Sequence, residues 1–555
     1  MRFFKTLAAA SALVSTASAL ATVSRSGRYL YSNGARFSIK GVAYQPQGTV
    51  GSGDPTGFPE PTDYVDPLAD SAGCARDLPY LKQLGVNAVR VYSVNSALNH
   101  DSCMAALSGA GIYVILDLAL PVNGSINRAA PAWTVNLLDL YLGTINSFYK
   151  YDNLLAFNIG NEIVTDVADT VSGPYIKAAA RDVKAYLQSI SSTALVSFSS
   201  TDGDTTWRLA LSDYLACDTA ATSIDLFGLN NYRWCGAGTI SNYAALITDY
   251  TDFPIPAYFS EFGCVTSPPR LWTEVASIFG DSTLTNEWSG GVAFSYFPAV
   301  GGYGMVNISS DAQTVTTGSD FALLQAQYGN VTVPTTPAQS AAGSNTQATC
   351  PAVSATWLAS TTLPPTPEAG VCSCLQQNVV SCGFSNTASN NTSPILGDII
   401  AYTCSALPAL GGDCTPIGSN GTTGTYGPFS VCDPTTQVNF AISQYYQLSN
   451  RNAAACSFSG NATVVSTGPA TETAAASAAS SCAAAAFTGT TVPAAPSSTA
   501  ANTKGGSTAT GSGSSSSSTG GSKSGAVGGF ESLRTGAAFA GMALAAVAGG
   551  IAVLI

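Results

Sequence analysis

Histidine is almost absent from this chain of 555 residues, which contains a single one. One imidazole cannot supply the several ligands of a zinc site, and it argues against catalytic triads built on histidine. Basic residues are scarce as well, because 21 lysines and arginines stand against 33 acidic residues and give a formal net charge of −12. Phosphate binding needs a basic face, so the composition excludes a nucleic-acid partner.

Charges are also missing from two apolar runs at the ends of the chain. Residues 1–19 place two basic residues before an apolar run and the small-residue sequence ASA, which is typical of a secretory signal peptide; a buried N-terminal helix is the alternative. Residues 536–555 are apolar and uncharged, and follow a polar spacer and the small residues Ser524 and Gly525. This pattern predicts GPI attachment at one of these two residues, with 526–555 as the propeptide and a plain tail anchor as the alternative.

Cysteines and glycosylation sequons fit the same secretory route. The 14 cysteines are predicted to form disulfides rather than to bind metal. N-x-S/T sequons, which predict exposed loops on a secreted chain, occur at Asn123, Asn307, Asn330, Asn390, Asn391, Asn420 and Asn461. We therefore expect a protein of the cell surface, on the outer leaflet of the plasma membrane.

Composition divides the chain into segments. Residues 20–330 are richly patterned and are predicted to be the main folded domain, and residues 331–349 are predicted to be a Pro/Thr/Ser/Ala-rich linker. Residues 350–482 hold nine cysteines and predict a small disulfide-rich domain. Residues 483–525 are too rich in Ser, Thr, Gly and Ala to bury a core, so they predict a flexible stalk.

Short apolar runs alternate with helix-like stretches in the first domain. The runs are 37–44, 86–92, 112–118, 154–160, 194–200, 224–232, 256–263 and 291–297. Nearly continuous apolar strands suggest burial on both faces, as in a parallel sheet. Eight such strands alternating with helices predict an α/β fold, a (β/α)₈ TIM barrel. A doubly wound open sheet is the rival, but no Gly-rich phosphate loop marks its first turn.

Polar residues close these runs, at the end of a barrel where chemistry normally sits. They are Gln45, Tyr92, Asp117, Asn161, Glu162, Asp202, Asn231, Tyr232, Glu261 and Tyr296. Two facing carboxylates, such as Glu162 and Glu261, can cleave a glycosidic bond: one protonates the leaving oxygen and the other attacks or activates water. Asn161 could bind a sugar 2-hydroxyl. Surface or capping roles are the alternative for both glutamates, and a helix N-cap for Asp117.

The sequence blocks GVAYQPQG, RVYSVN, FNIGNEI, NNYRWCG, YFSEFGC and SYF follow one another in order. As a set they resemble glycoside hydrolase family 72, the fungal GPI-anchored 1,3-β-glucanosyltransferases. The later VCSCLQQNVVSC resembles the cysteine-rich carbohydrate-binding module of family 43, which implies a glucan-binding module.

The resemblance implies a retaining double displacement with Glu162 as acid/base and Glu261 as nucleophile. An internal β-1,3 linkage of a donor glucan is cleaved, and the enzyme-bound fragment passes to the 3-hydroxyl of an acceptor glucan. No nucleotide sugar, cofactor or metal is implied. An endo-β-1,3-glucanase would use the same two carboxylates, because the acceptor decides between transfer and hydrolysis. A non-catalytic glucan-binding wall protein is a third hypothesis.

Further positions match the family one by one. Those implied to contact substrate are Gln45, Tyr92, Asp117, Asn161, Tyr232, Tyr296 and Tyr303. Arg208 resembles an acceptor-side arginine. Gly203 separates Asp202 from Asp204 just before it, so the sequence leaves open which aspartate contacts the acceptor.

The family also implies three disulfides. They are Cys74–Cys103, Cys217–Cys350 and Cys235–Cys264. The second would tie the start of the cysteine-rich region to the barrel. The pairing of the remaining cysteines stays open.

Overall fold

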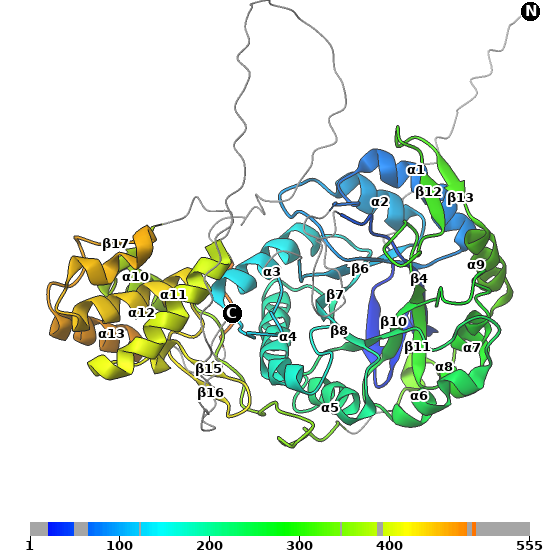
Figure 1. Ribbon diagram of the computed structural model, residues 1–555. Coiled ribbons are helices and arrows are strands. Elements are labelled where there is room, and N and C mark those ends of the chain that lie inside the picture. Colours follow the sequence, from blue (N-terminus) through cyan, green and yellow to red (C-terminus); the bar gives the residue numbers. More distant parts are fainter. Residues whose placement is uncertain are drawn as a thin grey trace, which may run out of the picture.

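The computed structural model describes residues 20–48, 65–120, 124–343, 347–385, 392–485 and 491–495 (Figure 1). The predicted signal peptide, most of the predicted stalk and the predicted GPI signal with Ser524 and Gly525 lie outside the described residues. None of the helices in the described part of the chain is long and apolar enough to cross a membrane.

Eight parallel strands close into a barrel in chain order, which confirms the predicted (β/α)₈ fold. The strands are β4 (Ile39–Ala43), β5 (Ala88–Val91), β6 (Tyr113–Asp117), β7 (Leu154–Asn161), β8 (Leu195–Thr201), β9 (Leu226–Asn231), β10 (Ala257–Phe262) and β11 (Trp288–Ala293). The last strand begins earlier than the predicted run 291–297. Gly290 and Gly291 weaken its strand pattern in the sequence, yet a Cβ at Gly290 would lie 2.3 Å from the Ile39 carbonyl oxygen.

Helices follow the strands and form the outer ring of the barrel (Figure 1). They are α1 (Ser71–Leu84), α2 (Asp101–Gly109), α3 (Val135–Phe148), α4 (Gly173–Ser189), α5 (Thr205–Ala216), α6 (Ala244–Asp249), α7 (Glu274–Gly280), α8 (Ser282–Thr285) and α9 (Ser319–Asn330). A short hairpin of β12 (Val306–Ile308) and β13 (Val315–Thr317) precedes α9.

An antiparallel sheet at the start of the chain packs against the interior of the barrel. It consists of β1 (Val23–Ser26), β2 (Tyr29–Ser32) and β3 (Ala35–Phe37). Val23 and Leu30 are buried in one cluster with the strand residues Ile115 and Tyr258. This apolar cluster fills one part of the barrel interior. The polar residues that follow the strands are not part of it and can form the site.

The cysteine-rich module is a helical unit with its own core. Its elements are α10 (Ala369–Asn378), β14 (Cys382–Phe384), α11 (Thr392–Ala406), β15 (Ser419–Asn420), β16 (Thr425–Tyr426), α12 (Pro434–Leu448), β17 (Ala462–Val464) and α13 (Glu472–Ala485). Leu375, Phe429 and Ile442 are buried at its centre. Its disulfides are Cys372–Cys432, Cys374–Cys482, Cys382–Cys456 and Cys404–Cys414.

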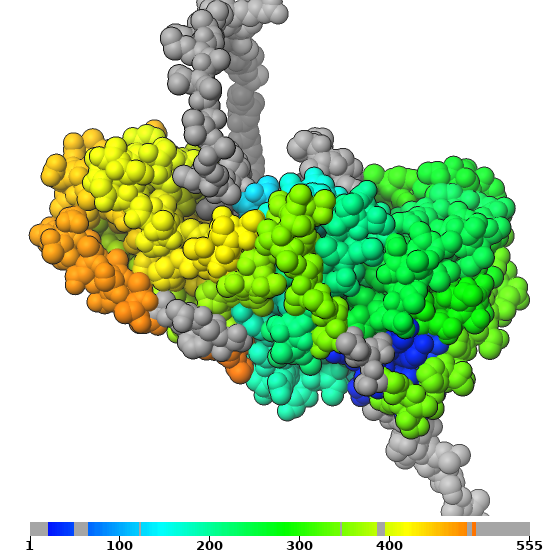
Figure 2. All heavy atoms as spheres, turned by 90° about the horizontal axis from the view of Figure 1, so that it is seen from below, coloured from blue at the N-terminus to red at the C-terminus, as the bar shows by residue number. Residues whose placement is uncertain are grey.

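The chain between barrel and module lies against the barrel surface, where the sequence predicts a linker. Gln339 donates from its backbone N–H to the Gly34 carbonyl over 2.9 Å. Farther on, Trp357 is 1 % exposed and its ring lies 5.1 Å from that of Tyr214. Figure 2 shows this light-green chain running across the molecule toward the yellow module. We call residues 331–343 and 347–368 the strap, because their contacts place them on the barrel surface.

A second contact docks the module on the barrel. The Tyr175 hydroxyl of α4 lies 2.6 Å from Ser419 Oγ, and its ring lies 5.9 Å from that of Tyr426. Both partners belong to the β15–β16 hairpin. In addition, Val135 at the start of α3 donates its N–H to the Val431 carbonyl over 2.8 Å. The strap and these contacts fix the module against α3 and α4.

Candidate active site

The end of β7 presents Glu162 through an unusual backbone turn. A Cβ at Gly160 would lie 2.5 Å from Ile163 Cδ1 and 3.1 Å from the Phe198 ring, so a larger residue would displace both side chains. Glu162 itself has a φ of 50°, a left-handed conformation that costs a non-glycine residue free energy. Its N–H donates to the Ser199 carbonyl over 2.9 Å, and its carbonyl accepts from Arg128 Nη2 over 3.0 Å. The neighbouring strand and loop thus hold the strained conformation.

Glu261 near the end of β10 is fixed through both carboxylate oxygens. The Tyr92 hydroxyl donates to Oε1 over 2.8 Å, and the Tyr232 hydroxyl donates to Oε2 over 2.7 Å. The strand then turns at Gly263, whose φ is 117° and where a Cβ would lie 2.3 Å from the Trp272 ring. Two phenols, one after β5 and one after β9, therefore orient one carboxylate from two separate parts of the barrel rim.

Arg90 on β5 is a fully buried cation beneath both glutamates. It donates to both oxygens of Asp117, over 3.2 and 2.9 Å. It also donates to Asn161 Oδ1 over 2.9 Å and to Glu261 Oε1 over 3.3 Å. Charge-assisted hydrogen bonds between buried groups are strong and directional. Arg90 consequently aligns three of the predicted site residues at once.

Asn230 on β9 connects the two glutamates. Its Nδ2 donates to Glu162 Oε1 over 2.9 Å and to Asn161 Oδ1 over 3.1 Å. Its Oδ1 accepts from Ser260 Oγ over 2.7 Å and lies 3.4 Å from Arg90 Nη1. The carboxyl groups of Glu162 and Glu261 are therefore joined through one amide and one guanidinium at the same end of the barrel.

The charges of the site act on the nucleophile candidate in opposite directions. Burial raises the pKa of Glu261 to about 7, and the charge of Glu162 also raises it. Arg90 and the hydrogen bonds from Tyr232 and Tyr92 lower it. Burial raises the pKa of each of these two phenols well above its usual value, so both stay protonated and can donate.

Gln45 and Asp117 support the site from below. Gln45 Oε1 accepts the backbone N–H groups of Tyr92 and Ser93, over 3.2 and 3.1 Å. Asp117 is 2 % exposed and accepts from Arg90 and, over 3.0 Å, from Asn158. In the structure these two residues brace Tyr92 and Arg90, and Asp117 does not cap a helix.

Tyr296 does not reach the site that the sequence assigns to it. It is fully buried, and its hydroxyl donates to Asp77 over 3.2 Å. Phe294, directly after β11, is half-buried and contacts the rings of Tyr92 and Tyr303 at 6.2 and 5.0 Å. Phe294 therefore takes the place predicted for Tyr296, because β11 ends earlier than predicted. Tyr303 is partly exposed and contacts Tyr232 at 5.7 Å.

The two aspartates that the sequence leaves undecided have different surroundings. Asp202 accepts from Arg208, from Asn231 Nδ2 over 2.6 Å and from Arg233 Nη2 over 2.7 Å. Asp204 is exposed and caps α5 by accepting the Thr206 N–H over 2.8 Å. Asp202 therefore belongs to the charged cluster, whereas Asp204 is a helix cap.

Within this cluster the two arginines differ in exposure. Arg208, predicted to contact the acceptor, is fully buried and also donates to Asp249. The Arg233 side chain is 31 % exposed. Arg233, rather than Arg208, is thus the cation that solvent or a ligand can reach.

The three disulfides implied by the family resemblance are present in the structure. Cys74–Cys103 joins α1 to α2, and Cys235–Cys264 joins the chain after β9 to the chain after β10. Cys217–Cys350 fastens the strap to the end of α5.

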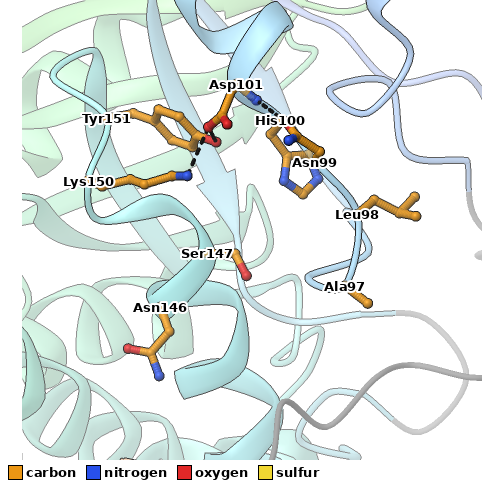
Figure 3. A pocket seen from close by; sticks show the side chains of 9 residues that line it. All are labelled: Ala97, Leu98, Asn99, His100, Asp101, Asn146, Ser147, Lys150 and Tyr151. Carbon is orange, nitrogen blue, oxygen red and sulfur yellow. Dashed lines mark hydrogen bonds and ion pairs between the residues drawn. The ribbon is translucent and has the colours of Figure 1, made fainter.

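A hollow of about 260 Å³ lies elsewhere, between the chain at residues 97–101 and the end of α3 (Figure 3). Its charged groups are paired: Asp101 accepts from Lys150 and from Tyr151, each over 2.8 Å. The single histidine, His100, lines it and pairs with Asp66 over 2.8 Å. The hollow shares no residue with the site around Glu162 and Glu261.

Arg90 and Asn230 are functional residues that sequence reasoning missed. Side chains alternate along a strand, so Arg90 shares a face with Tyr92, and Asn230 shares one with Tyr232. A charge inside the apolar run VNAVRVY was a usable signal. Arg128 gave no such signal, because it reaches Glu162 from a loop.

Known protein families match both the barrel and the cysteine-rich module. The family described as glucanosyltransferase, glycoside hydrolase family 72, matches residues 11–332. The chain belongs to this family. The X8 domain matches residues 380–463, inside the cysteine-rich module.

Curated relatives match both parts of the chain. The 1,3-beta-glucanosyltransferase gas1 of Schizosaccharomyces pombe is 38 % identical over 447 residues, which cover 79 % of this chain and 78 % of that protein. The 1,3-beta-glucanosyltransferase GAS2 of Saccharomyces cerevisiae is 34 % identical, with 76 % of each chain covered.

Solved structures of Saccharomyces cerevisiae Gas2p share the architecture. A mutant without ligand superposes with a TM-score of 0.74 at 32 % identity, covering 84 % of this chain and 97 % of that chain. The same mutant in complex with laminaritetraose and laminaripentaose gives a TM-score of 0.71 at 32 % identity, covering 81 % and 96 %.

Proposed function

We propose that this protein is a 1,3-β-glucanosyltransferase that elongates β-1,3-glucan by a retaining double displacement. The observation that carries the proposal is the pairing of Glu261, oriented by two phenols, with Glu162 through Asn230 and Arg90. Relatives named for this activity, and a Gas2p structure holding laminari-oligosaccharides, support the choice of polymer.

In the first step the Glu261 carboxylate attacks the anomeric carbon of an internal glucose. The bond from that carbon to the bridging oxygen breaks, and Glu162 gives its proton to the departing oxygen of the reducing-end fragment. A glycosyl ester on Glu261 remains. Arg90 and the two phenols fix the attacking oxygen, which lowers the entropy cost of reaching the transition state.

In the second step the 3-hydroxyl of an acceptor glucan replaces water. Glu162, now a carboxylate, takes the hydroxyl proton while the oxygen attacks the anomeric carbon and releases Glu261. Two inversions give a β linkage and a longer chain. We place Asn161 at the sugar 2-hydroxyl, and Tyr232, Tyr303 and Phe294 at the apolar faces of the sugar rings.

Incubation of the secreted ectodomain with one defined β-1,3-oligosaccharide tests the proposal. Products longer than the substrate are expected, together with shorter fragments of matching amount. A product profile with shorter chains only would identify an endo-β-1,3-glucanase instead. Binding of β-1,3-glucan without any change in its chain length would favour the non-catalytic wall protein.

The cellular arrangement is a proposal as well. We infer a secreted protein held on the outer leaflet of the plasma membrane by a GPI anchor at Ser524 or Gly525, with a module that binds glucan. Phospholipase C specific for phosphatidylinositol should release it from intact cells. Deletion of residues 526–555 should send it into the medium, and retention of that variant on membranes would contradict the anchor.

A further inference from the structure

One cation on the rim of the barrel has hydrogen-bond donors that the protein leaves unused. Arg233, which follows β9, donates from Nε and, over 2.7 Å, from Nη2 to the two carboxylate oxygens of Asp202. This side-on pairing leaves the end of the guanidinium fork, formed by Nη1 and Nη2, without an acceptor in the part of the chain that the structure describes. The side chain is partly exposed, so a ligand can reach these donors.

The charges around Arg233 favour a neutral ligand. Asp202 also accepts from the buried Arg208, which donates to Asp249 as well, and from Asn231 Nδ2 over 2.6 Å. The two arginines and the two aspartates of this cluster together carry no net charge. A phosphate or a carboxylate would therefore meet two carboxylates beside the exposed cation, whereas sugar hydroxyl oxygens can accept its free N–H groups without that repulsion.

The backbone that carries Arg233 is held at both of its polar groups. The Arg233 N–H donates to Asn231 Oδ1 over 3.3 Å, and its carbonyl accepts from Asn242 Nδ2 over 3.2 Å. The next residue, Trp234, is buried and donates from its indole to Thr273 Oγ1 over 2.9 Å. Because the side chain is also paired with Asp202, little conformational freedom is left to lose when a ligand binds, and preorganised donors of this kind contribute more to affinity.

The strand order places this cation on the Glu162 side of the site. The guanidinium lies on Asp202, which follows β8. In the barrel β8 is hydrogen-bonded to β7, the strand of Glu162, whereas β9 separates it from β10, the strand of Glu261. Glu162 is itself bonded to β8, because its N–H donates to the Ser199 carbonyl over 2.9 Å. A sugar that contacts Arg233 would thus lie beyond Glu162 as seen from Glu261.

In the proposed reaction the sugar on that side is first the leaving group and then the acceptor, since Glu162 exchanges a proton with both. We propose that Arg233 binds hydroxyl groups of the acceptor sugar, other than the reacting 3-hydroxyl, and so favours transfer over hydrolysis. A bound acceptor is present when the glycosyl ester on Glu261 reacts, whereas attack by water gains nothing from this contact. The inference rests on the proposed glucanosyltransferase function.

The test measures how the glycosyl ester divides between the acceptor and water. The secreted ectodomain receives a β-1,3-oligosaccharide donor whose reducing end has been converted to an alditol, and a short β-1,3-oligosaccharide acceptor with a fluorescent amine label at its reducing end. Longer labelled products report transfer, and new aldehyde ends report hydrolysis. Because this division follows ester formation, a loss of folded enzyme lowers both products equally and leaves their ratio unchanged.

Arg233→Met should lower the ratio of transfer to hydrolysis about tenfold, because hydrogen bonds from a charged donor to the acceptor are lost. A higher acceptor concentration should restore the ratio. Arg233→Lys keeps an ion pair with Asp202 but not the planar fork, so the ratio should fall about threefold. Arg25→Met is the matched control: Arg25 is 24 % exposed and pairs over 3.2 Å with Asp225, which precedes β9 at the opposite end of that strand. This control should keep the wild-type ratio.

Two results would overturn the inference while the proposed function stands, because the wild-type protein still forms longer labelled products. One is a ratio that stays at the wild-type value in Arg233→Met, which includes an equal fall in transfer and hydrolysis; the Lys variant decides if the Met variant does not fold. The other is a fall of the same size in Arg25→Met. New aldehyde ends without any longer labelled product from the wild-type protein would overturn the proposed function and this inference together.

Discussion

The barrel and the cysteine-rich module are stabilised in different ways. The barrel has a large continuous core, and its few disulfides join helices and loops around the sheet. The module has a small core, and disulfides such as Cys372–Cys432 and Cys382–Cys456 run through its buried centre. Small units cannot bury enough apolar surface to be stable alone, so covalent links replace packing there.

The difference explains where the chemistry lies. A buried cation such as Arg90 destabilises a fold unless rigid neighbouring elements supply hydrogen-bond acceptors for it. The closed sheet supplies them through Asp117, Asn161 and Asn230. The module has no comparable buried charge among its described residues and offers aromatic surface instead. Catalytic activity should therefore depend on the barrel. Reduction of the disulfides should destabilise the module more than the barrel.

The largest effect on activity is expected from substitution of the two glutamates, which removes the catalytic groups without disturbing the fold of the barrel. Glu162→Gln should lower the rate on glucan by about 10²–10⁴-fold, since an amide cannot give up a proton to the leaving oxygen. Glu261→Gln should abolish turnover, because no glycosyl ester can form. Product-length assays measure both, with the exposed Glu368→Gln as a control that keeps full activity. Substantial turnover in Glu261→Gln would exclude it as the nucleophile.

Disulfide removal should separate the two regions. Replacement of Cys374 and Cys482 by alanine opens a link across 108 residues and should cost about 4–5 kcal/mol, whereas Cys404–Cys414 spans only 10 and should cost less. All six tryptophans precede the module, so their fluorescence reports the barrel alone. Circular dichroism should show early loss of helix while the tryptophan transition stays in place. A shifted tryptophan transition would mean that the regions unfold together.

Removal of the buried cation should move the pH profile. Arg90 lowers the pKa of Glu261, so Arg90→Met should raise it, and attack needs the ionised carboxylate. The acidic limb of kcat/KM should therefore move to higher pH by about 1–3 units, and by less in Arg90→Lys, which keeps the charge. An unchanged limb in a folded Arg90→Met variant would show that another group sets it.

The smallest effects are expected from substitution of the two nearby aspartates, Asp202 and Asp204. Asp204→Ala removes a helix cap and should cost about 1 kcal/mol in urea unfolding with unchanged kinetics. Asp202→Asn leaves Arg208 and Arg233 without their shared carboxylate, so it should raise the KM for the acceptor as well as lower stability. Equal kinetics in both variants would remove the charged cluster from the binding site.

The sequence predicted the strands well because their apolar runs are long and end in polar residues. The bounds of β11 differ from the predicted run because Gly290 and Gly291 hide its start, and Tyr296 lies beyond its end, beside Asp77. The sequence selected Glu162 and Glu261 as candidates by their positions at strand ends, but it did not find the residues that contact them in the structure.

Local sequence patterns cannot predict contacts between residues that are far apart in the sequence, such as those that Arg128 and Arg90 make with the two glutamates. Arg128 meets Glu162 across 34 positions, and Arg90 meets Glu261 across 171. Such contacts depend on how the barrel closes and not on nearby residues. The strap shows the same limit: its Pro/Thr/Ser/Ala-rich composition suggests a flexible linker, yet tertiary contacts with Gly34 and Tyr214 fix it.

The strap and the docked hairpin also determine how two attachment points on one molecule can cooperate. Tethered sites gain avidity when a flexible connection lets both engage at once. Here the docking of Tyr175 on Ser419 leaves the spacing between barrel and module fixed. A polysaccharide bound by both barrel and module would have to bend to match that spacing. The stiffness of the polysaccharide, and not the movement of a domain, would therefore decide which polysaccharides bind at both places.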